Sequence, residues 1–319
     1  MTDSAPAADR IGPEPCWVVT GPTASGKTEV ALELARRHPV EIVSVDSMQV
    51  YRGMDVGTAK ASMEQMAAVP HHMIDVLEPE EPCNVGRFCR MAREAMEAVW
   101  ARGRRPLLVA GSPMYLKALL WGLLDGPGRD GSLRAELERL LAAEGSEGLH
   151  RRLAERDPHA AGRIHPNDVQ RLTRALEYTG LTGRPISAGQ DQFAGPPRVP
   201  HRMVGLRWPR EQLYARIDRR VDRMMARGLP AEVESLRGRL GPQARQALGY
   251  KEFLAVHAGR CTAAEAVERI KRKTRRYAKH QMTWFSHFPD LTWVDAECCS
   301  VQDLADRCEV VLNGRLDSP

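Results

Sequence analysis

The chain has 319 residues, and 46 Lys and Arg face 41 Asp and Glu, for a formal net charge of +5. This length allows one large or two modest domains, and the charge excess is too small by itself to prove a polyanionic partner. Seven cysteines without a C-x-x-C pair argue against a disulfide framework and favour reduced thiols. No apolar run reaches 18 residues and the polar start, 1–15, has no apolar signal core, so we expect a cytoplasmic protein with no membrane contact.

The first third of the chain alternates short apolar runs with amphipathic segments. The runs at 17–20, 42–45, 73–77 and 107–110 are bounded by turn residues, which predicts four strands with helices between them. Asn84 is placed to cap the helix before the last of these runs. Strands that alternate with helices predict an α/β fold, with an open parallel sheet flanked by helices.

A phosphate-binding loop follows the first predicted strand. Residues Gly21 to Thr28 match G-x-x-x-x-G-K-[ST] at every fixed position, between a strand and an amphipathic helix, which is the context this motif requires. Gly21 and Gly26 let backbone N–H groups turn toward an anion, and Lys27 and the helix N-terminus add positive charge. Thr28 is placed to ligate Mg²⁺. The loop predicts a phosphorylated ligand and leaves open a nucleoside triphosphate or a diphosphate.

Polar residues follow the predicted strands at the edge where ligands of open α/β sheets bind. Asp46 follows the second strand, where a carboxylate either accepts a proton, helps to hold Mg²⁺ or only ends a turn. Ser112 brings a hydroxyl after the fourth strand, and Asp75 is the remaining candidate for a second magnesium carboxylate. We expect His71 and His72 to be a hydrogen-bonded structural pair rather than metal ligands.

The composition changes after Leu124. A Gly- and Pro-rich linker at 125–131 precedes a helix capped by Ser132 and running to Leu141, and the region to about 200 shows short helices without strand signals. A strand at 203–208 then resumes the α/β pattern. The helices that follow it are predicted at 210–227, 231–239, 243–257 and 262–285. The sequence therefore predicts a phosphate-loop core at 14–124 and 201–313, interrupted by a small helical domain at 125–200.

Basic residues concentrate near the C-terminus, in the segment 269–279. On a helix, Ile270, Tyr277 and Trp284 share one apolar stripe, and five cations lie on the opposite side with Glu268 as the nearby acid. We therefore favour binding to a phosphate backbone over a solvated face. The five cations are Lys271, Arg272, Arg275, Arg276 and Lys279.

Two further basic clusters are weaker signals. Gln170 and Arg174 lie one turn apart on a predicted helix, where an amide and a guanidinium suit contacts with bases and phosphate. The helix after the fifth strand carries several arginines, and we expect one of them to reach the phosphate site, since developing charge on a leaving phosphate needs a cation. They are Arg216, Arg219, Arg220 and Arg223.

Seven segments together resemble the tRNA dimethylallyltransferase family, also called tRNA isopentenyltransferases. They are GPTASGKT (21–28), VDSMQVYRGMDVGTAK (45–60), HHMIDVLEP (71–79), GSPMYLKALL (111–120), RIHPNDVQRLTRALE (163–177), ALGYKEF (247–253) and RRYAKHQMTWF (275–285). The resemblance spans nearly the whole chain. Four positions depart from the family pattern: Ala110 and Ser112 in Ala110-Gly111-Ser112, where the family commonly has Gly-Gly-Thr, His280 in place of Arg, and Gln246, which is less cationic than its counterparts.

The resemblance implies transfer of a dimethylallyl group from dimethylallyl diphosphate to N6 of adenosine 37, in the anticodon stem-loop of tRNA, with release of diphosphate. It implies Asp46 as general base, Lys27 and Arg220 as catalytic cations, Mg²⁺ as cofactor on Thr28, and a monomer. The implied diphosphate site is Gly21, Pro22, Thr23, Ala24, Ser25, Gly26, Lys27 and Thr28. The implied tRNA contacts are Asp46, Ser47, Met48, Gln49, Ser112, Arg134, Gln170, Arg171, Leu172, Thr173, Arg174, Gln246, Tyr250 and Lys251.

Other functions use the same loop. A small-molecule kinase binds ATP there and uses Asp46 as the base on a hydroxyl, but it does not explain the basic C-terminal helix. A nucleotide switch needs a guanine-reading Asn-Lys-x-Asp element, which the sequence lacks. The plant enzymes that prenylate free adenine nucleotides lack the two tRNA-contact segments. Prenyl transfer to tRNA therefore remains the leading hypothesis, with the kinase as its alternative.

Overall fold

A computed structural model describes residues 12–123, 130–193 and 195–314. The chain divides into two compact units, and unit 2, Trp121–Pro197, interrupts unit 1. The two segments of unit 1 that flank unit 2 are hydrogen-bonded to each other, because the amides of Arg198 and Val199 donate to the carbonyl oxygen of Leu120, at 2.8 and 3.1 Å. The second unit is therefore inserted into the first. Within the described residues, no helix is long and apolar enough to cross a membrane.

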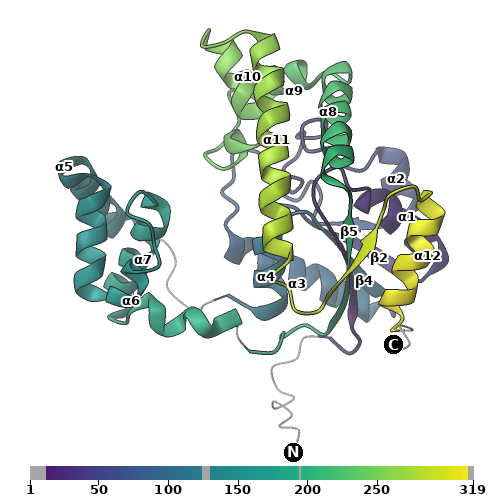
Figure 1. The fold of residues 1–319 in the computed structure, drawn as a ribbon, viewed down its shortest axis with the longest axis horizontal. Helices are drawn as coiled ribbons and strands as arrows, with labels where there is room; N and C mark the ends of the chain where they lie inside the picture. The colour runs from purple at the N-terminus through teal and green to yellow at the C-terminus, as the bar shows by residue number, and fades with distance from the viewer. Residues whose placement is uncertain (1–11, 124–129, 194, 315–319) are drawn as a thin grey trace, which may run out of the picture. The chain divides into compact units, whose positions relative to one another are not determined.

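A six-stranded sheet forms the centre of unit 1 (Figure 1). Every paired strand is parallel, in the order β3-β2-β4-β1-β5-β6. All residues of β1 and β2 are buried, as expected for parallel strands that helices cover. The strands are β1 Cys16–Thr20, β2 Val40–Val45, β3 His71–His72, β4 Arg105–Ala110, β5 His201–Arg207 and β6 Leu291–Asp295. The predicted α/β class is confirmed.

Helices cover the sheet and extend beyond one of its edges. The first and last helices, α1 and α12, pack side by side, with Val30, Leu34, Leu304 and Cys308 in one apolar cluster with the strands (Figure 1). Because β5 leads directly into α8, the group α8–α11 lies at the carboxyl ends of the strands, where α11 packs on α8 and α10. The helices of unit 1 are α1 Lys27–Arg37, α2 Met63–Ala68, α3 Val85–Ala101, α4 Pro113–Trp121, α8 Arg210–Ala226, α9 Leu229–Leu236, α10 Tyr250–His257, α11 Ala263–Phe285 and α12 Val301–Leu312, with the 3-10 turn η3 at Ala244–Gln246.

Three local predictions for unit 1 can be compared with the structure. Asn84 caps α3 as predicted, since its side chain accepts a hydrogen bond from the amide of Arg87 at 2.8 Å. The strand predicted at 73–77 is wrong, because Met73 (φ 64°) and Asp75 (φ 54°) adopt left-handed conformations that end the extended chain after β3.

The helix predicted at 243–257 is two pieces, η3 and α10. Gly249 separates them with a φ of 95°, a conformation that other residues rarely adopt, and its amide donates to the carboxylate of Glu252 at 2.9 Å. The sequence analysis also gave no prediction for β6 and α12, which complete the sheet edge and one of its faces.

Unit 2 is helical throughout its described residues. Its elements are α5 Gly131–Arg156, with a kink at Gly145, α6 Pro158–Ala161, α7 Val169–Thr182 and the 3-10 helix η2 Ile186–Phe193. Leu149, Leu153 and Leu172 are fully buried in its own apolar cluster. The cap predicted at Ser132 is wrong, since Asp130 caps α5 by accepting from the amide of Leu133 at 2.8 Å, while the Ser132 hydroxyl donates to the same carboxylate oxygen.

Candidate active site

The phosphate-binding loop connects β1 to α1 in the predicted context. Gly21 has a φ of 141°, and a Cβ there would lie 2.8 Å from the carbonyl oxygen of Leu206, so the loop passes too close to β5 for any side chain. Gly26 has a φ of 97° at the helix start. The Lys27 ammonium group donates to the carbonyl oxygens of Gly21 and Pro22, at 2.9 and 2.7 Å. The loop is thus a closed turn with its lysine folded back over it.

Lys27 has an unusual protonation equilibrium. Burial first and the charge of Arg220 second lower its pKa to about 7, against the opposing attraction of Asp46 and Glu29. Burial also lowers the pKa of Arg220. Two cations that lie close together and are shielded from water carry positive charge that nearby acids do not balance. Such a site favours an anionic ligand.

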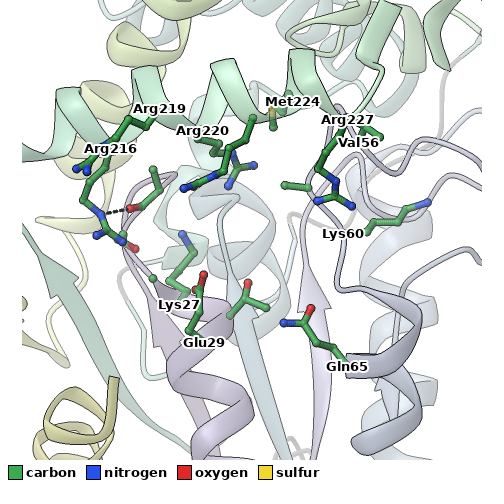
Figure 2. A pocket seen from close by; sticks show the side chains of 16 residues that line it. Lys27, Glu29, Val56, Lys60, Gln65, Arg216, Arg219, Arg220, Met224 and Arg227 are labelled. Carbon is green, nitrogen blue, oxygen red and sulfur yellow. Dashed lines mark hydrogen bonds between the residues drawn. The ribbon is translucent and has the colours of Figure 1, made fainter. Parts of the chain in front are cut away.

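A cavity of about 500 Å³ surrounds these two cations. Figure 2 shows Lys27 of α1 facing Arg220 of α8. Arg216 and Arg219 lie earlier on α8, and Arg227 directly follows the end of this helix. Arg216 donates to the carbonyl oxygen of Ala24 at 2.8 Å, and its guanidinium lies 4.1 Å from the ring centre of Trp208, so α8 is fastened to the loop. The arrangement supplies several guanidinium groups opposite the loop amides.

A second cavity of about 370 Å³ contains Asp46. One carboxylate oxygen, Oδ1, accepts from the amides of Met48 (2.8 Å) and Gln49 (3.3 Å). The other, Oδ2, lies beside Gly111, where a Cβ would approach it to 3.3 Å. The hydroxyl of Ser112 accepts from the amide of Ser47 at 3.2 Å, which ties the end of β4 to the same turn. Backbone contacts therefore hold the carboxylate in one orientation.

The two cavities share a wall. Lys27, Thr28 and Arg220 line both of them, so the loop cations lie between the arginine-rich cavity and the Asp46 cavity. A ligand bound to the loop through phosphate oxygens can therefore present its other end to the Asp46 cavity.

Gln281 of α11 is a site residue that the sequence analysis missed. Its side chain is only 3% exposed, accepts from the amide of Thr23 at 2.9 Å and donates to the carbonyl oxygen of Gly111 at 2.5 Å. One amide group therefore joins the phosphate-binding loop to the end of β4. The available signal was its position, since Ala278, Gln281 and Phe285 follow the helical spacing of a buried face.

The predicted tRNA contacts in unit 1 differ in accessibility. Gln49 and Gln246 line the Asp46 cavity, and Lys251 is exposed and donates to Gln246 Oε1 at 2.9 Å. Tyr250, by contrast, is fully buried and donates its hydroxyl proton to Glu232 at 2.5 Å. The Tyr250 side chain is therefore part of the core of unit 1.

Two of the predicted contacts in unit 2, Arg134 and Arg174, pair with one buried acid. Glu177 accepts from Arg134 at 3.0 Å and pairs with Arg174 at 3.5 Å. Gln170 and Arg171 are exposed and Thr173 is half-buried on the same helix. The Leu172 side chain is fully buried in the core of this unit.

The basic helix α11 differs from its prediction in two ways. Ile270 is buried, but Tyr277 and Trp284 are 39% and 41% exposed, because the buried face follows Ala278 and Phe285 instead. Three of its cations are also paired with acids of neighbouring helices, which the local sequence did not reveal. The pairs are Lys271 with Asp222, Lys273 with Glu252 and Arg275 with Asp218. Arg272, Arg276 and Lys279 are exposed, without an ion pair to any described residue.

The remaining candidates have structural partners. His72 Nε2 lies 2.7 Å from the carboxylate of Glu41, and His71 Nδ1 lies 2.7 Å from the carbonyl oxygen of Val69. Asp75 accepts from Lys60 at 2.5 Å. Among the described residues, no group of three or more His, Cys, Asp and Glu side chains is arranged to hold a metal ion.

Comparisons with known proteins agree with this geometry. A family model described as IPP transferase matches residues 49–288, and one described as isopentenyl transferase matches residues 15–75. The chain is 47% identical over 287 residues to the tRNA dimethylallyltransferase of Shouchella clausii, covering 89% of this chain and 92% of that protein. It is 46% identical to the enzyme of the same name from Geobacter sulfurreducens, covering 87% and 91%.

Solved structures give the same result. The tRNA delta(2)-isopentenylpyrophosphate transferase of Staphylococcus epidermidis superimposes with a TM-score of 0.69 and 36% identity, covering 95% of this chain and all of that one. A eukaryotic dimethylallyltransferase acting on tRNA superimposes with a TM-score of 0.83 and 26% identity, covering 95% and 80%. The two family models together span residues 15–288, which include the phosphate-binding loop, Asp46 and α11. The chain accordingly belongs to the tRNA dimethylallyltransferase family of prenyl-transferring enzymes.

Proposed function

We propose that this enzyme transfers the dimethylallyl group of dimethylallyl diphosphate to N6 of adenosine 37 in tRNA and releases diphosphate. The observation that carries the proposal is the shared wall of the two cavities, because it brings cations suited to a diphosphate next to a carboxylate suited to a base. The relatives support transfer to tRNA, and none of them supports the kinase alternative.

The loop cations would stabilise the leaving group. An allylic diphosphate ionises readily once its developing negative charge is neutralised, and the loop amides, Lys27 and Arg220 are fixed before the substrate arrives. A bound diphosphate would favour the charged form of Lys27, so the depressed pKa of this lysine couples diphosphate binding to proton uptake.

Magnesium fits the same place. In phosphate sites Mg²⁺ is held by substrate oxygens, water and one or two side chains, and the Thr28 hydroxyl group is placed to be such a side chain where it lines both cavities. The ion would neutralise charge on the departing diphosphate.

Asp46 would accept the proton that the amine loses as its nitrogen bonds to carbon. The amides of Met48 and Gln49 fix one oxygen, so the second, beside Gly111, is the acceptor. The adenine base cannot reach an enclosed cavity while stacked in the RNA, so it must be extruded into it. Contacts to the surrounding anticodon stem-loop would offset part of that cost, and Arg272, Arg276 and Lys279 are the exposed cations of α11 that are available for them.

We further propose that the enzyme acts as a monomer in the cytoplasm. All seven cysteines are free thiols, which agrees with a reducing compartment.

The proposal is tested by replacing the base. Asp46→Asn keeps the shape and the hydrogen bonds from Met48 and Gln49 but does not accept the amine's proton, so single-turnover transfer to saturating tRNA should fall by about 10²- to 10⁴-fold. Labelled dimethylallyl diphosphate is offered with bulk tRNA or with free AMP. Label in AMP rather than tRNA, or near-normal transfer by Asp46→Asn, would contradict the proposal.

A further inference from the structure

A third cavity, of about 240 Å³, adjoins the Asp46 cavity in unit 1. Ser47, Tyr277 and Gln281 line both of them, so they are separated by a single layer of side chains. The Tyr277 hydroxyl lies 3.5 Å from the carbonyl oxygen of Gly111, which places this ring in the dividing wall. The other lining residues are Ser112, Pro113, Met114, Tyr115, His280 and Trp284.

This cavity is lined by exposed apolar side chains. Of the large hydrophobic residues that are exposed in the described structure, Met114 (49%), Tyr277 (39%) and Trp284 (41%) meet here. Tyr277 and Trp284 lie two turns apart on α11, and Met114 lies in the first turn of α4, so they converge from two elements. Single exposed apolar residues need no explanation, but a group of them around one hollow indicates a binding surface.

The place of this apolar group, next to the cavity that contains Asp46, indicates what it binds. Exposed aromatic rings bind unstacked nucleotides, because each ring accepts the face of a base. The exposed cations Arg276 and Lys279 do not line the third cavity, and they lie on another side of α11 from Tyr277 and Trp284. The rings and the neighbouring Asp46 cavity, not these cations, therefore identify the occupant.

We propose that the third cavity, lined by Met114, Tyr277 and Trp284, is a subsite for a second unstacked base of the RNA, that of a nucleotide directly adjacent to the modified adenosine. This base stacks on Trp284 while the target base enters the Asp46 cavity on the other side of Tyr277. The shared wall makes neighbouring nucleotides the occupants. The inference rests on the proposed function, and it assigns to this subsite part of the enzyme's preference for the sequence around its target.

The test is a binding cycle between protein and RNA. Wild type and Trp284→Ala are titrated with a synthetic anticodon stem-loop carrying a normal base or an abasic residue at each position flanking the target adenosine. Loss of one stacked base weakens binding by about 5- to 150-fold, so Trp284→Ala should bind the normal RNA that much more weakly. One flanking abasic RNA should show the same loss with wild type and little further loss with the variant. Trp284→Phe, which keeps a ring, should recover most of the affinity.

Val310→Ala is the matched control, since Val310 is 43% exposed on α12, away from the third cavity. The subsite would be overturned if each abasic residue weakened RNA binding by the same factor in the wild type and in Trp284→Ala. It would also be overturned if Trp284→Ala bound the normal RNA as tightly as the wild type does. Binding is measured without dimethylallyl diphosphate. If the effects of Trp284→Ala and of the abasic residue on RNA affinity are not additive but no prenyl group is transferred, the result counts against the proposed function alone. If the two effects are additive and prenyl transfer is normal, the result counts against the subsite alone.

Discussion

The depressed pKa of Lys27 predicts that diphosphate binding takes up a proton. In the free enzyme burial lowers this pKa to about 7, so at pH 8 about nine-tenths of the Lys27 side chains are neutral. A bound diphosphate returns the pKa toward its ordinary value near 10.5. Between these two values the complex holds one more proton than the free enzyme. The affinity for diphosphate should therefore fall by about tenfold, or 1.4 kcal/mol, for each pH unit above 7.

The same shift affects stability with a defined sign. The folded pKa lies below the unfolded value, so between pH 7 and 10.5 the unfolded chain binds more protons and the free energy of unfolding rises with pH. Lys27 thus destabilises the ligand-free fold most below pH 7, and bound diphosphate should remove that effect.

Calorimetric titration with inorganic pyrophosphate at pH 8, in two buffers of different ionisation enthalpy, gives the number of protons taken up. Lys27→Arg is the control, because its guanidinium stays charged and the remaining uptake then belongs to the ligand and to other groups. The wild type should take up close to one proton more than Lys27→Arg. Equal uptake by the two proteins would refute the argument that Lys27 is largely neutral before the anion binds.

Three further substitutions test the surroundings of the site. Gly111→Ala puts a methyl group 3.3 Å from the base carboxylate, so single-turnover transfer should fall by about tenfold while gel shifts show unchanged tRNA binding; an unchanged rate would show that the carboxylate has room to move. Replacing Arg272 and Arg276 by Gln should lower the slope of log affinity against log salt for tRNA by up to about two, whereas Arg275→Gln, already paired with Asp218, should change it less. Gln281→Met removes the partner of the Thr23 amide and leaves the Gly111 carbonyl oxygen with only the 3.5 Å contact from Tyr277, so the free energy of unfolding in urea should fall by about 1–3 kcal/mol. A smaller loss would mean that water replaces the amide.

The parts of the site that are local in sequence could be predicted. The loop from Gly21 to Thr28 and the turn after Asp46 are fixed by neighbours within a few residues, and the alternation of apolar runs predicted β1, β2, β4 and β5. β6 is a short edge strand with three half-buried residues, one buried residue (Val294) and one exposed residue (Asp295), and it offered no comparable run.

The parts that depend on distant partners could not be predicted. Gln281 contacts Thr23 and Gly111, more than 150 residues away in the chain, and nothing near it in the sequence identifies those partners. The charges of α11 were misjudged for the same reason, because the acids that pair with Lys271 and Arg275 belong to α8. The strand predicted at 73–77 failed because two left-handed residues interrupt an otherwise suitable apolar run.

The interruption of unit 1 by unit 2 has a consequence for how the chain is made. The centre of the sheet is β1, and its neighbour on one side, β5, is synthesised only after the whole of unit 2. On the ribosome one edge of β1 therefore stays open while residues 121–197 emerge, and an open strand edge is a place where chains pair wrongly. The hydrogen bonds at Leu120 bring the two ends of the insertion together, and unit 2 has an apolar cluster of its own. If unit 2 folded early around this cluster, it would shorten the effective loop between β1 and β5. The exposed edge of β1 would then pair with β5 sooner.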